Sequence, residues 1–324
     1  MRPLVIILGP TASGKTALAV RLAQQFGGEI LACDSTQVYR GFDIGTAKPA
    51  EAERGGIPHR LMDLAEPSDI FTAGEYRRRA VVVLDDLSRR GRLPILTAGT
   101  GLYLRALLEG LADAPERSEG LRARLTAAAA RRGHTYLYRL LRRMDPPSAA
   151  RISPNDTQKL IRAVEICMMS GRPLSEVHRA GREPLQGYRA IKIGIQPERE
   201  LLHRRIEERV HAMLGRGWPA EVAALLQRDP LFSAKPFEFI GYRELREHLQ
   251  GQKTLEEAAQ AIAVATRQYA KRQMTWFRKE AGVTWISGFG DDPAVVAQAS
   301  RLLAEALQQP LAEAPARRDI SDQV

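Results

Sequence analysis

Short apolar runs and longer helix-forming segments alternate over the first hundred residues. The apolar runs at 2–8, 29–33 and 94–97 have the length and composition of buried strands. Residues 14–26 lead into two glycines and predict a helix, and the segment 72–90, rich in helix formers, predicts another. Because strands and helices alternate in this way when a sheet is parallel, the pattern predicts an α/β fold with helices flanking the sheet.

Two further apolar stretches affect how this region is interpreted. Residues 61–64 form a short run that predicts a third strand. The run AVVVLDD, at residues 80–86, is similar to the apolar strand and metal-binding Asp of a nucleotidase. We interpret this run as helical because it lies inside the long segment 72–90, and that interpretation removes the obvious second magnesium ligand of an NTPase.

The pattern changes after the first hundred residues. Between 114 and 185 there are helical runs and little strand signal, and strand character returns at 188–195. The later segments that predict helices are 198–214, 218–228, 241–250 and 254–279. We therefore expect an α/β core built from two separate parts of the chain, an all-helical insertion and a disordered tail, with boundaries at 1–113 plus 186–309, 114–185 and 310–324.

Charge is concentrated in the expected insertion. The whole chain carries a formal net charge of +10 and has a pI near 9.9. The window 114–185 holds 14 Lys and Arg against 7 Asp and Glu, a balance of +7 that supplies most of the total. Such a balance favours a polyanionic partner, although an Arg-rich composition explains it equally well from charge alone.

Cysteine usage and hydropathy indicate the compartment. The two cysteines, Cys33 and Cys167, are far apart and form no metal-binding pair, so we expect a reducing environment. No apolar run reaches membrane-spanning length, and the run at 2–8 continues into a glycine-rich loop, unlike a signal peptide. We expect a cytoplasmic protein, and no feature requires more than a monomer.

The glycine-rich loop GPTASGKT follows the first predicted strand and opens the first predicted helix. This strand–loop–helix context is typical of a P-loop, in which backbone N–H groups and the helix N-terminus cradle a diphosphate or triphosphate. Lys15 adds a point charge, and the Thr16 hydroxyl is a candidate ligand of Mg²⁺. The residues expected to bind diphosphate are Gly9, Pro10, Thr11, Ala12, Ser13, Gly14, Lys15 and Thr16.

A second loop, CDSTQVYRGFDIGTAKP at residues 33–49, follows the second predicted strand. Asp34 stands at the carboxyl end of that strand, the edge of an open α/β sheet at which ligands bind. A carboxylate at this position is a candidate proton acceptor beside the phosphate loop, although an Asp followed by Ser is also a common cap.

Seven ordered blocks resemble the tRNA dimethylallyltransferase family, from the start of the chain to about residue 287. They are GPTASGKTALA, DSTQVYRGFDIGTAKP, PHRLMDL, AGTGLYLRALLEG, RISPNDTQKLIRAVE, IGYRE and ATRQYAKRQMTWFR. The family commonly has two glycines before the threonine of the fourth block, whereas this chain has Ala98, and we expect little effect from one added methyl group. The resemblance implies transfer of a dimethylallyl group from dimethylallyl diphosphate to N6 of the adenosine 3′-adjacent to the anticodon, at the tRNA anticodon stem-loop.

The resemblance also implies roles for individual residues. Asp34 would be the base, and Thr100 would lie beside the reacting centre and contact the diphosphate or the amine. Arg209 matches an arginine that contacts the diphosphate, although a solvated helix face explains it equally well. Mg²⁺ would be held through Thr16.

Four blocks would contact the RNA. The pocket for the flipped adenine would be lined by Asp34, Ser35, Thr36 and Gln37. The other contacts would come from Gln158, Lys159, Leu160, Ile161 and Arg162; from Phe239, Ile240, Gly241, Tyr242, Arg243 and Glu244; and from Arg272, Gln273, Met274, Thr275, Trp276, Phe277, Arg278 and Lys279. Trp276 of the last block shares one helical stripe with Tyr269, just before that block, which suits rings stacked on unpaired bases. An amphipathic helix with Trp276 in the core fits the same pattern.

Three alternatives remain at this stage. An adenylate isopentenyltransferase shares the loop and acts on free AMP, ADP or ATP, but it needs no basic insertion. A small-molecule P-loop kinase needs a second metal carboxylate. The third alternative, a non-catalytic RNA-binding protein, does not explain why a phosphate loop lies beside Asp34 and Thr100.

Overall fold

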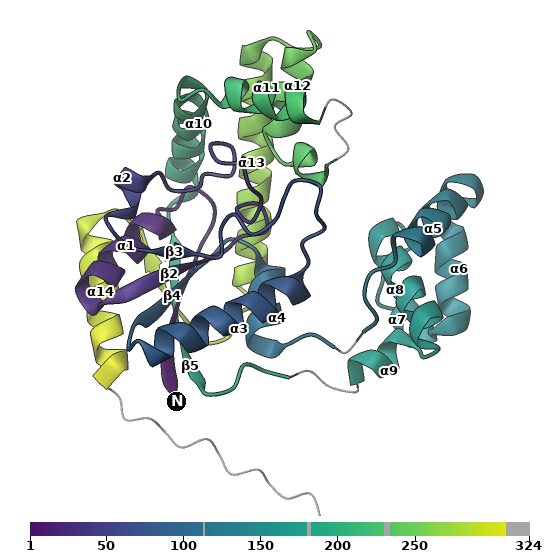
Figure 1. Ribbon diagram of the computed structural model, residues 1–324, viewed down its shortest axis with the longest axis horizontal. Helices are drawn as coiled ribbons and strands as arrows, with labels where there is room; N and C mark the ends of the chain where they lie inside the picture. The colour runs from purple at the N-terminus through teal and green to yellow at the C-terminus, as the bar shows by residue number, and fades with distance from the viewer. Residues whose placement is uncertain (113, 180–182, 230–233, 309–324) are drawn as a thin grey trace, which may run out of the picture. The chain divides into compact units, whose positions relative to one another are not determined.

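The computed structural model describes residues 1–112, 114–179, 183–229 and 234–308. Within these residues six parallel strands form one sheet, in the order β3-β2-β4-β1-β5-β6 (Figure 1). The strands are β1 Arg2–Leu8, β2 Gly28–Cys33, β3 His59–Arg60, β4 Leu93–Ala98, β5 Tyr188–Gln196 and β6 Val283–Ser287.

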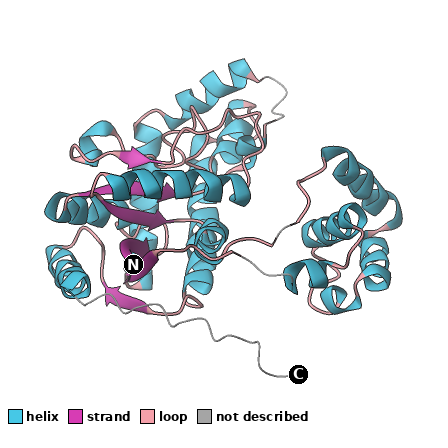
Figure 2. Cartoon of the chain, turned by 60° about the horizontal axis from the view of Figure 1, so that its bottom comes forward, coloured by secondary structure: helices cyan, strands magenta, loops and turns pink. Residues whose placement is uncertain are grey.

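The central strands are buried on both faces. Every residue of β2 is buried, as are the last five residues of β1. Parallel sheets need this double cover because their crossover helices lie on both sides, and Figure 2 shows helices on both sides of the sheet. On one side, α1 and α14 pack against Val5, Ile30 and Ile95 in a shared apolar core.

The helices around the sheet begin and end at recognisable signals. Gly14, with a φ of 86°, begins α1, and Gly27, with a φ of 66°, ends it. Thr72 caps α3 by accepting a hydrogen bond from the Glu75 N–H, and Thr254 caps α13 in the same way from the Glu257 N–H. The helices are α1 Lys15–Phe26, α2 Glu51–Arg54, α3 Ala73–Arg89, α4 Gly101–Glu109, α10 Arg199–Gly215, α11 Trp218–Arg228, α12 Tyr242–Leu249, α13 Leu255–Phe277 and α14 Pro293–Gln308, with a 3₁₀ turn at Lys235–Glu238.

The chain divides into two compact units, residues 1–107 with 186–324, and residues 108–185. Unit 2, residues 108–185, is built from helices around its own core of Leu137, Leu141, Leu160 and Val164. The buried Glu165 carboxylate accepts hydrogen bonds from two arginines of this unit, which satisfies its charge. Its helices are α5 Glu119–Arg132, α6 His134–Met144, α7 Pro146–Ala149, α8 Thr157–Ser170 and α9 Leu174–Arg179.

Most of the elements expected from sequence are confirmed. Residues 80–86 lie inside α3, so the helical interpretation of AVVVLDD is correct. The strand expected at 61–64 is wrong, because Leu61 and Asp63 have φ values of 68° and 55°, which are incompatible with an extended strand. The strand that pairs with β2 is instead β3, at His59–Arg60. The sequence also gave no expectation of α4, β6 or α14.

Two expectations concern the membrane and the end of the chain. Among the described residues, no helix has the length and apolar character that crossing a bilayer requires. The tail expected to be disordered, residues 310–324, lies outside the described residues.

Candidate active site

Three loops meet at the carboxyl edge of the sheet because of the strand register. Ala98, the last residue of β4, is paired with Leu8 of β1 on one side and with Cys33 of β2 on the other. Since the strands are parallel, the residues that follow them emerge at one edge. The phosphate loop that begins at Gly9 and the loop that begins at Asp34 therefore flank the β4–α4 turn.

The phosphate loop wraps around the N-terminus of α1. Lys15 folds back over it and donates a hydrogen bond from Nζ to the Pro10 carbonyl at 2.7 Å. Ser13 is fully buried, and its Oγ has no hydrogen-bond partner among the described residues. Gly9 must lack a side chain, because a Cβ there would lie 2.7 Å from the Ile195 carbonyl oxygen. The loop amides and the helix N-terminus form an anion site.

Two cations and one carboxylate interact electrostatically at this site. Burial lowers the pKa of Lys15 from 10.5 to about 7, Asp34 opposes that shift, and Arg209 adds to it. Burial also lowers the pKa of Arg209, with Arg216 and Arg205 contributing in the same direction. An anion bound in the loop would favour the protonated form of Lys15.

Asp34 presents one fixed oxygen and one oxygen directed at the neighbouring turn. Its Oδ1 accepts hydrogen bonds from the Thr36 N–H at 2.9 Å and from the Thr36 hydroxyl at 2.7 Å. Its Oδ2 faces Gly99, where a Cβ would come within 2.3 Å of it. The carboxylate is therefore held in one orientation, and Gly99 provides the space for it.

Thr100 orients the residue after Asp34. Its Oγ1 accepts the Ser35 N–H at 2.9 Å and lies 3.2 Å from Ser35 Oγ, to which it donates. The Gly99 and Thr100 N–H groups donate to the Cys33 carbonyl at 3.0 and 2.9 Å. Burial raises the pKa of the Cys33 thiol to about 12, so that thiol is not a nucleophile.

The loop after Asp34 is held by residues that the sequence did not single out. The buried Lys48 donates to the Tyr39 carbonyl at 2.5 Å and pairs with Asp43 and Asp63. Glu221, on α11, accepts the Ile44 N–H at 2.7 Å. The only sequence signal for Lys48 was the presence of a lysine in the middle of a polar loop. Nothing in the sequence linked Glu221 to this loop.

The predicted RNA-contacting side chains divide into exposed and internal ones. The Gln37 side chain is bonded within its own loop, because its amide donates to the Thr46 and Ala47 carbonyls at 3.1 and 3.2 Å. In α8, Gln158 and Lys159 are exposed, whereas Leu160 and Ile161 lie in the core of unit 2 and Arg162 bonds to Glu165. The internal side chains of these blocks pack or hydrogen-bond within the protein and support the fold.

The block at the start of α12 is largely buried. Tyr242 donates its hydroxyl to Glu221 at 2.7 Å, and Glu244 accepts the Gly241 N–H at 2.6 Å. A Cβ at Gly241 would lie 1.9 Å from the Trp218 ring, which explains the glycine. Arg243 is exposed, and Phe239 and Ile240 are half-buried.

The block at the end of α13 has an exposed side and a buried side. Arg272, Thr275, Arg278 and Lys279 are exposed, Met274 is half-buried, and Gln273 and Phe277 are buried. Trp276 packs on Gly101, where a Cβ would come within 2.0 Å of its Nε1, and Arg105 lies 4.9 Å above its ring. Tyr269 donates its hydroxyl to the Gly99 carbonyl at 3.2 Å. Both rings thus contact the β4–α4 turn. The sequence pattern had instead suggested that these rings stack on bases.

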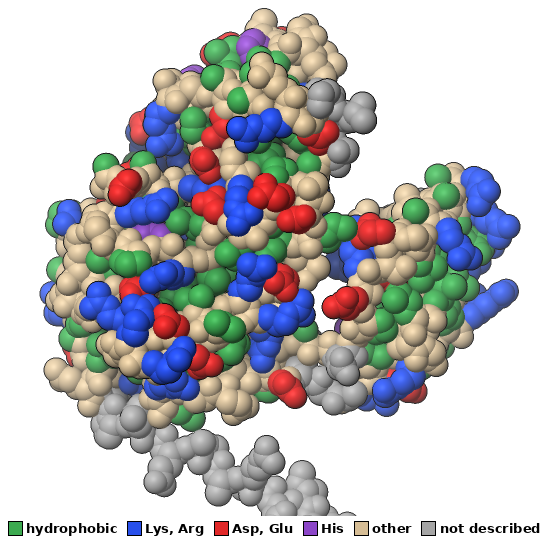
Figure 3. All heavy atoms as spheres, viewed as in Figure 1, with side chains coloured by type: hydrophobic (Ala, Val, Ile, Leu, Met, Phe, Trp, Pro, Cys, Tyr) green, Lys and Arg blue, Asp and Glu red, His purple; other side chains and the backbone are tan. Residues whose placement is uncertain are grey.

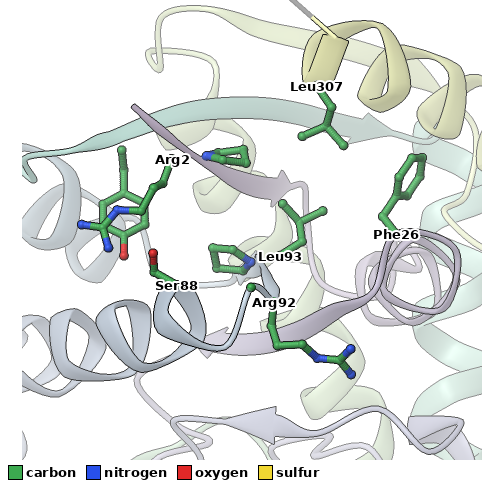
Figure 4. Close-up of a pocket in the computed structure, with 10 residues that line it drawn as sticks. Arg2, Phe26, Ser88, Arg92, Leu93 and Leu307 are labelled. Carbon is green, nitrogen blue, oxygen red and sulfur yellow. The ribbon is translucent and has the colours of Figure 1, made fainter. Parts of the chain in front are cut away.

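A cavity of about 360 Å³ lies at the opposite edge of the sheet (Figure 4). Arg2, Leu93 and Tyr188, which begin β1, β4 and β5, line it with Phe26 and Leu307. None of the residues expected to bind or react lines this cavity. Strand polarity therefore places the candidate active site at the other edge, with the phosphate loop, Asp34 and Thr100.

Comparison with known proteins gives one consistent match. The model of the IPP transferase family matches residues 37–280. A tRNA dimethylallyltransferase of Koribacter versatilis is 50% identical over 300 residues, covering 93% of this chain and 97% of the relative. Another, of Solibacter usitatus, is 49% identical over 307 residues, covering 95% of this chain and 100% of the relative.

Solved structures give the same match. The tRNA isopentenylpyrophosphate transferase of Bacillus halodurans has a TM-score of 0.69 and 37% identity, covering 95% of this chain and 97% of its own. A eukaryotic dimethylallyltransferase acting on tRNA has a TM-score of 0.79 and 27% identity, covering 95% of this chain and 78% of its own.

Proposed function

The chain belongs to the IPP transferase family, and on that premise we propose that it transfers a dimethylallyl group from dimethylallyl diphosphate to N6 of the adenosine 3′-adjacent to the anticodon in tRNA, releasing diphosphate. One structural observation carries the proposal. A fixed carboxylate, Asp34, lies at the same edge of the sheet as the phosphate loop and its half-buried Lys15.

Asp34 is proposed as the base. The N6 amine of adenine is a weak nucleophile, because its lone pair is delocalised into the ring, and it must lose a proton as it attacks. Two hydrogen bonds from Thr36 hold Oδ1, so Oδ2 is the atom available to accept that proton. Thr100 contributes by fixing Ser35, which places the carboxylate relative to the β4–α4 turn.

The phosphate loop is proposed to hold the leaving group. As the allylic C–O bond breaks, negative charge grows on the diphosphate while the allylic carbon bears partial positive charge. Donors already in place stabilise that charge without reorganisation. The loop amides, Lys15 and Arg209 supply these donors, and no attacking water is required.

Mg²⁺ is the proposed metal. In the described part of the chain, no group of three or more His, Cys, Asp or Glu side chains could hold a metal ion. Mg²⁺ needs no such group, because it keeps several waters and binds through one or two protein oxygens together with substrate phosphates. The Thr16 hydroxyl, at the first turn of α1, would hold the ion, which when bound offsets charge on the diphosphate.

The RNA is proposed to bind through exposed cations. In unit 2, Arg139, Arg142 and Arg143 share one face of α6, and Figure 3 shows Lys and Arg side chains where α5 and α6 lie. In the other unit, Arg243 and the exposed end of α13 supply further cations. The target adenine must be flipped out of the stacked loop, which costs a few kcal/mol and is offset by such backbone contacts.

The location and assembly state are also proposals. Both cysteines are free and buried, as suits the reducing cytoplasm that we propose as the compartment. We further propose that the protein acts as a monomer.

Removing cations from unit 2 should flatten the salt dependence of tRNA binding. Wild-type affinity should fall steeply as salt rises, because each Lys or Arg that neutralises a phosphate releases a counterion. The double variant Arg139→Gln/Arg142→Gln should reduce the slope of log K against log salt by roughly 1 to 2. Fluorescence anisotropy with labelled anticodon stem-loop RNA measures this slope.

The matched control is Arg89→Gln, an exposed arginine at the end of α3 that should leave the slope unchanged. A wild-type affinity that stays constant between low and moderate salt would rule out the proposed role of unit 2.

Binding of dimethylallyl diphosphate should take up a proton. In the free protein Lys15 has a pKa of about 7, so at pH 8.5 it is largely neutral, and a bound diphosphate raises that pKa and recharges it. Affinity should therefore weaken by up to about tenfold per pH unit between about pH 7.5 and 9. Calorimetry in two buffers of different ionisation enthalpy, without RNA, measures the uptake at pH 8.5.

Lys15→Met is the control for protons taken up by the ligand itself. The difference between wild type and Lys15→Met should approach one proton per mole of ligand. Equal uptake by the two proteins would show that Lys15 does not titrate on binding.

The acceptor is tested directly with labelled donor. The protein is incubated with radiolabelled dimethylallyl diphosphate and either unmodified tRNA or AMP. We expect label on tRNA only, and on N6 of the adenosine after digestion to nucleosides. Label on AMP would indicate an adenylate isopentenyltransferase, and label on neither would reject a transferase.

A further inference from the structure

Gln273 is a buried amide that joins two loops of the site. It lies on α13 with 5% of its surface exposed. Its Oε1 accepts the Thr11 N–H of the phosphate loop at 2.7 Å. Its Nε2 donates to the carbonyl of Gly99, in the β4–α4 turn, at 2.8 Å. One side chain from a distant helix thus bridges the ends of β1 and β4.

We propose that Gln273 is a positioning residue, which fixes the spacing between the loop that holds the leaving diphosphate and the turn against which the proton-accepting carboxylate rests. The proposal rests on the function proposed above. Gly99 is the link to the carboxylate, since Asp34 Oδ2 occupies the space beside it, where a Cβ would approach to 2.3 Å. A shift of the turn therefore moves Asp34 relative to the donor carbon.

The bridge between the phosphate loop and the β4–α4 turn requires an amide. The phosphate loop presents an N–H and the turn presents a carbonyl, so the bridge must accept at one end and donate at the other. The site is buried, and leaving either backbone group unpaired there carries a full desolvation cost. A carboxylate of the same shape would satisfy Thr11 but would set two oxygens against each other at Gly99.

The element that carries Gln273 is suited to this role. The helix α13 runs over 23 residues and begins with a capping box at Thr254. One turn earlier, Tyr269 donates its hydroxyl to the same Gly99 carbonyl at 3.2 Å. The adjacent Arg272 is exposed, so in the proposed function RNA contacts the same turn of helix that holds the two loops together.

The test compares Gln273→Glu and Gln273→Met over a range of pH. At pH 9 with saturating substrates, Gln273→Glu should lower the single-turnover rate roughly 10- to 100-fold, because the charged carboxylate repels the Gly99 carbonyl. Towards pH 6 the protonated carboxyl can donate again, so the ratio to wild type should rise to within about threefold. Gln273→Met has the same length and no hydrogen bonds, so its deficit should not change with pH.

Gln260→Glu is the matched control, since Gln260 is exposed nearer the start of the same helix. Its ratio to wild type should be flat with pH. Melting temperatures recorded at each pH separate a loss of fold from a loss of alignment.

Three outcomes would overturn the inference. Rates of both Gln273 variants within twofold of wild type would show that the bridge has no effect on catalysis. A deficit of Gln273→Glu that is independent of pH and follows the melting temperature would show a purely structural role. If Gln273→Glu does not fold, a Gln273→Met rate equal to wild type has the same consequence. A wild-type protein that labels no RNA would instead reject the proposed function.

Discussion

Asp34→Asn should reduce the single-turnover rate of prenyl transfer by roughly 10²- to 10⁴-fold, equivalent to about 3 to 5 kcal/mol of transition-state stabilisation. The substitution keeps the shape of the side chain and an oxygen that can accept the two hydrogen bonds from Thr36. It removes the proton acceptor at the Oδ2 position, next to Gly99. Rapid-quench assays with saturating tRNA and donor isolate the chemical step from binding.

Binding should change much less than the rate. Dissociation constants of the variant for dimethylallyl diphosphate and for tRNA should stay within a few-fold of wild type. Asp85→Asn is the control for the same chemical change, because Asp85 is exposed on α3 and pairs only loosely with Arg2 at 3.7 Å. Losses of similar size in rate and in affinity would mean that Asp34 positions a substrate and does not accept the proton.

Lys15→Met should reduce the rate at saturating donor by roughly 10²- to 10³-fold, as expected when one preorganised donor to a developing charge is removed. Lys15 is the cation of the phosphate loop itself, and the loop amides and Arg209 remain in the variant. Affinity for dimethylallyl diphosphate should fall as well, which separates this variant from Asp34→Asn. Inhibition by inorganic diphosphate, measured in the same assay, should weaken in parallel.

Lys253→Met provides the comparison, since Lys253 pairs with Glu247 away from the site. It should retain the wild-type rate and inhibition. A Lys15→Met protein that reaches the wild-type rate at high donor concentration would show that Lys15 binds the ground state only and does not stabilise the departing diphosphate.

Local sequence signals were enough to predict the phosphate loop and Asp34. The spacing of Gly9, Gly14 and Lys15 reflects backbone conformations and charges that the loop requires wherever it occurs. The position of Asp34 followed from the end of an apolar strand, and strand polarity then placed it at the ligand-binding edge. The helical interpretation of residues 80–86 succeeded because a long segment without breakers outweighs a short apolar run.

The remaining features depend on contacts between distant parts of the chain. Residues 61–64 read as a strand, but Leu61 and Asp63 adopt positive φ values, and Asp63 pairs with the buried Lys48. Gln273 looked like one polar residue in an RNA-binding block, and its bonds to Thr11 and Gly99 span most of the chain. Periodicity alone cannot distinguish a stripe that faces solvent from one that faces another loop.

The central claim is that the phosphate loop binds the leaving diphosphate of an allylic donor. The most direct test follows donor and product together. Unmodified tRNA is incubated with Mg²⁺ and either dimethylallyl diphosphate labelled in its prenyl group or ATP labelled in its γ-phosphate. We predict one prenyl group on RNA for each diphosphate released, in the absence of ATP. Phosphate label transferred from ATP, or prenyl transfer that requires ATP hydrolysis, would contradict the assignment of this loop.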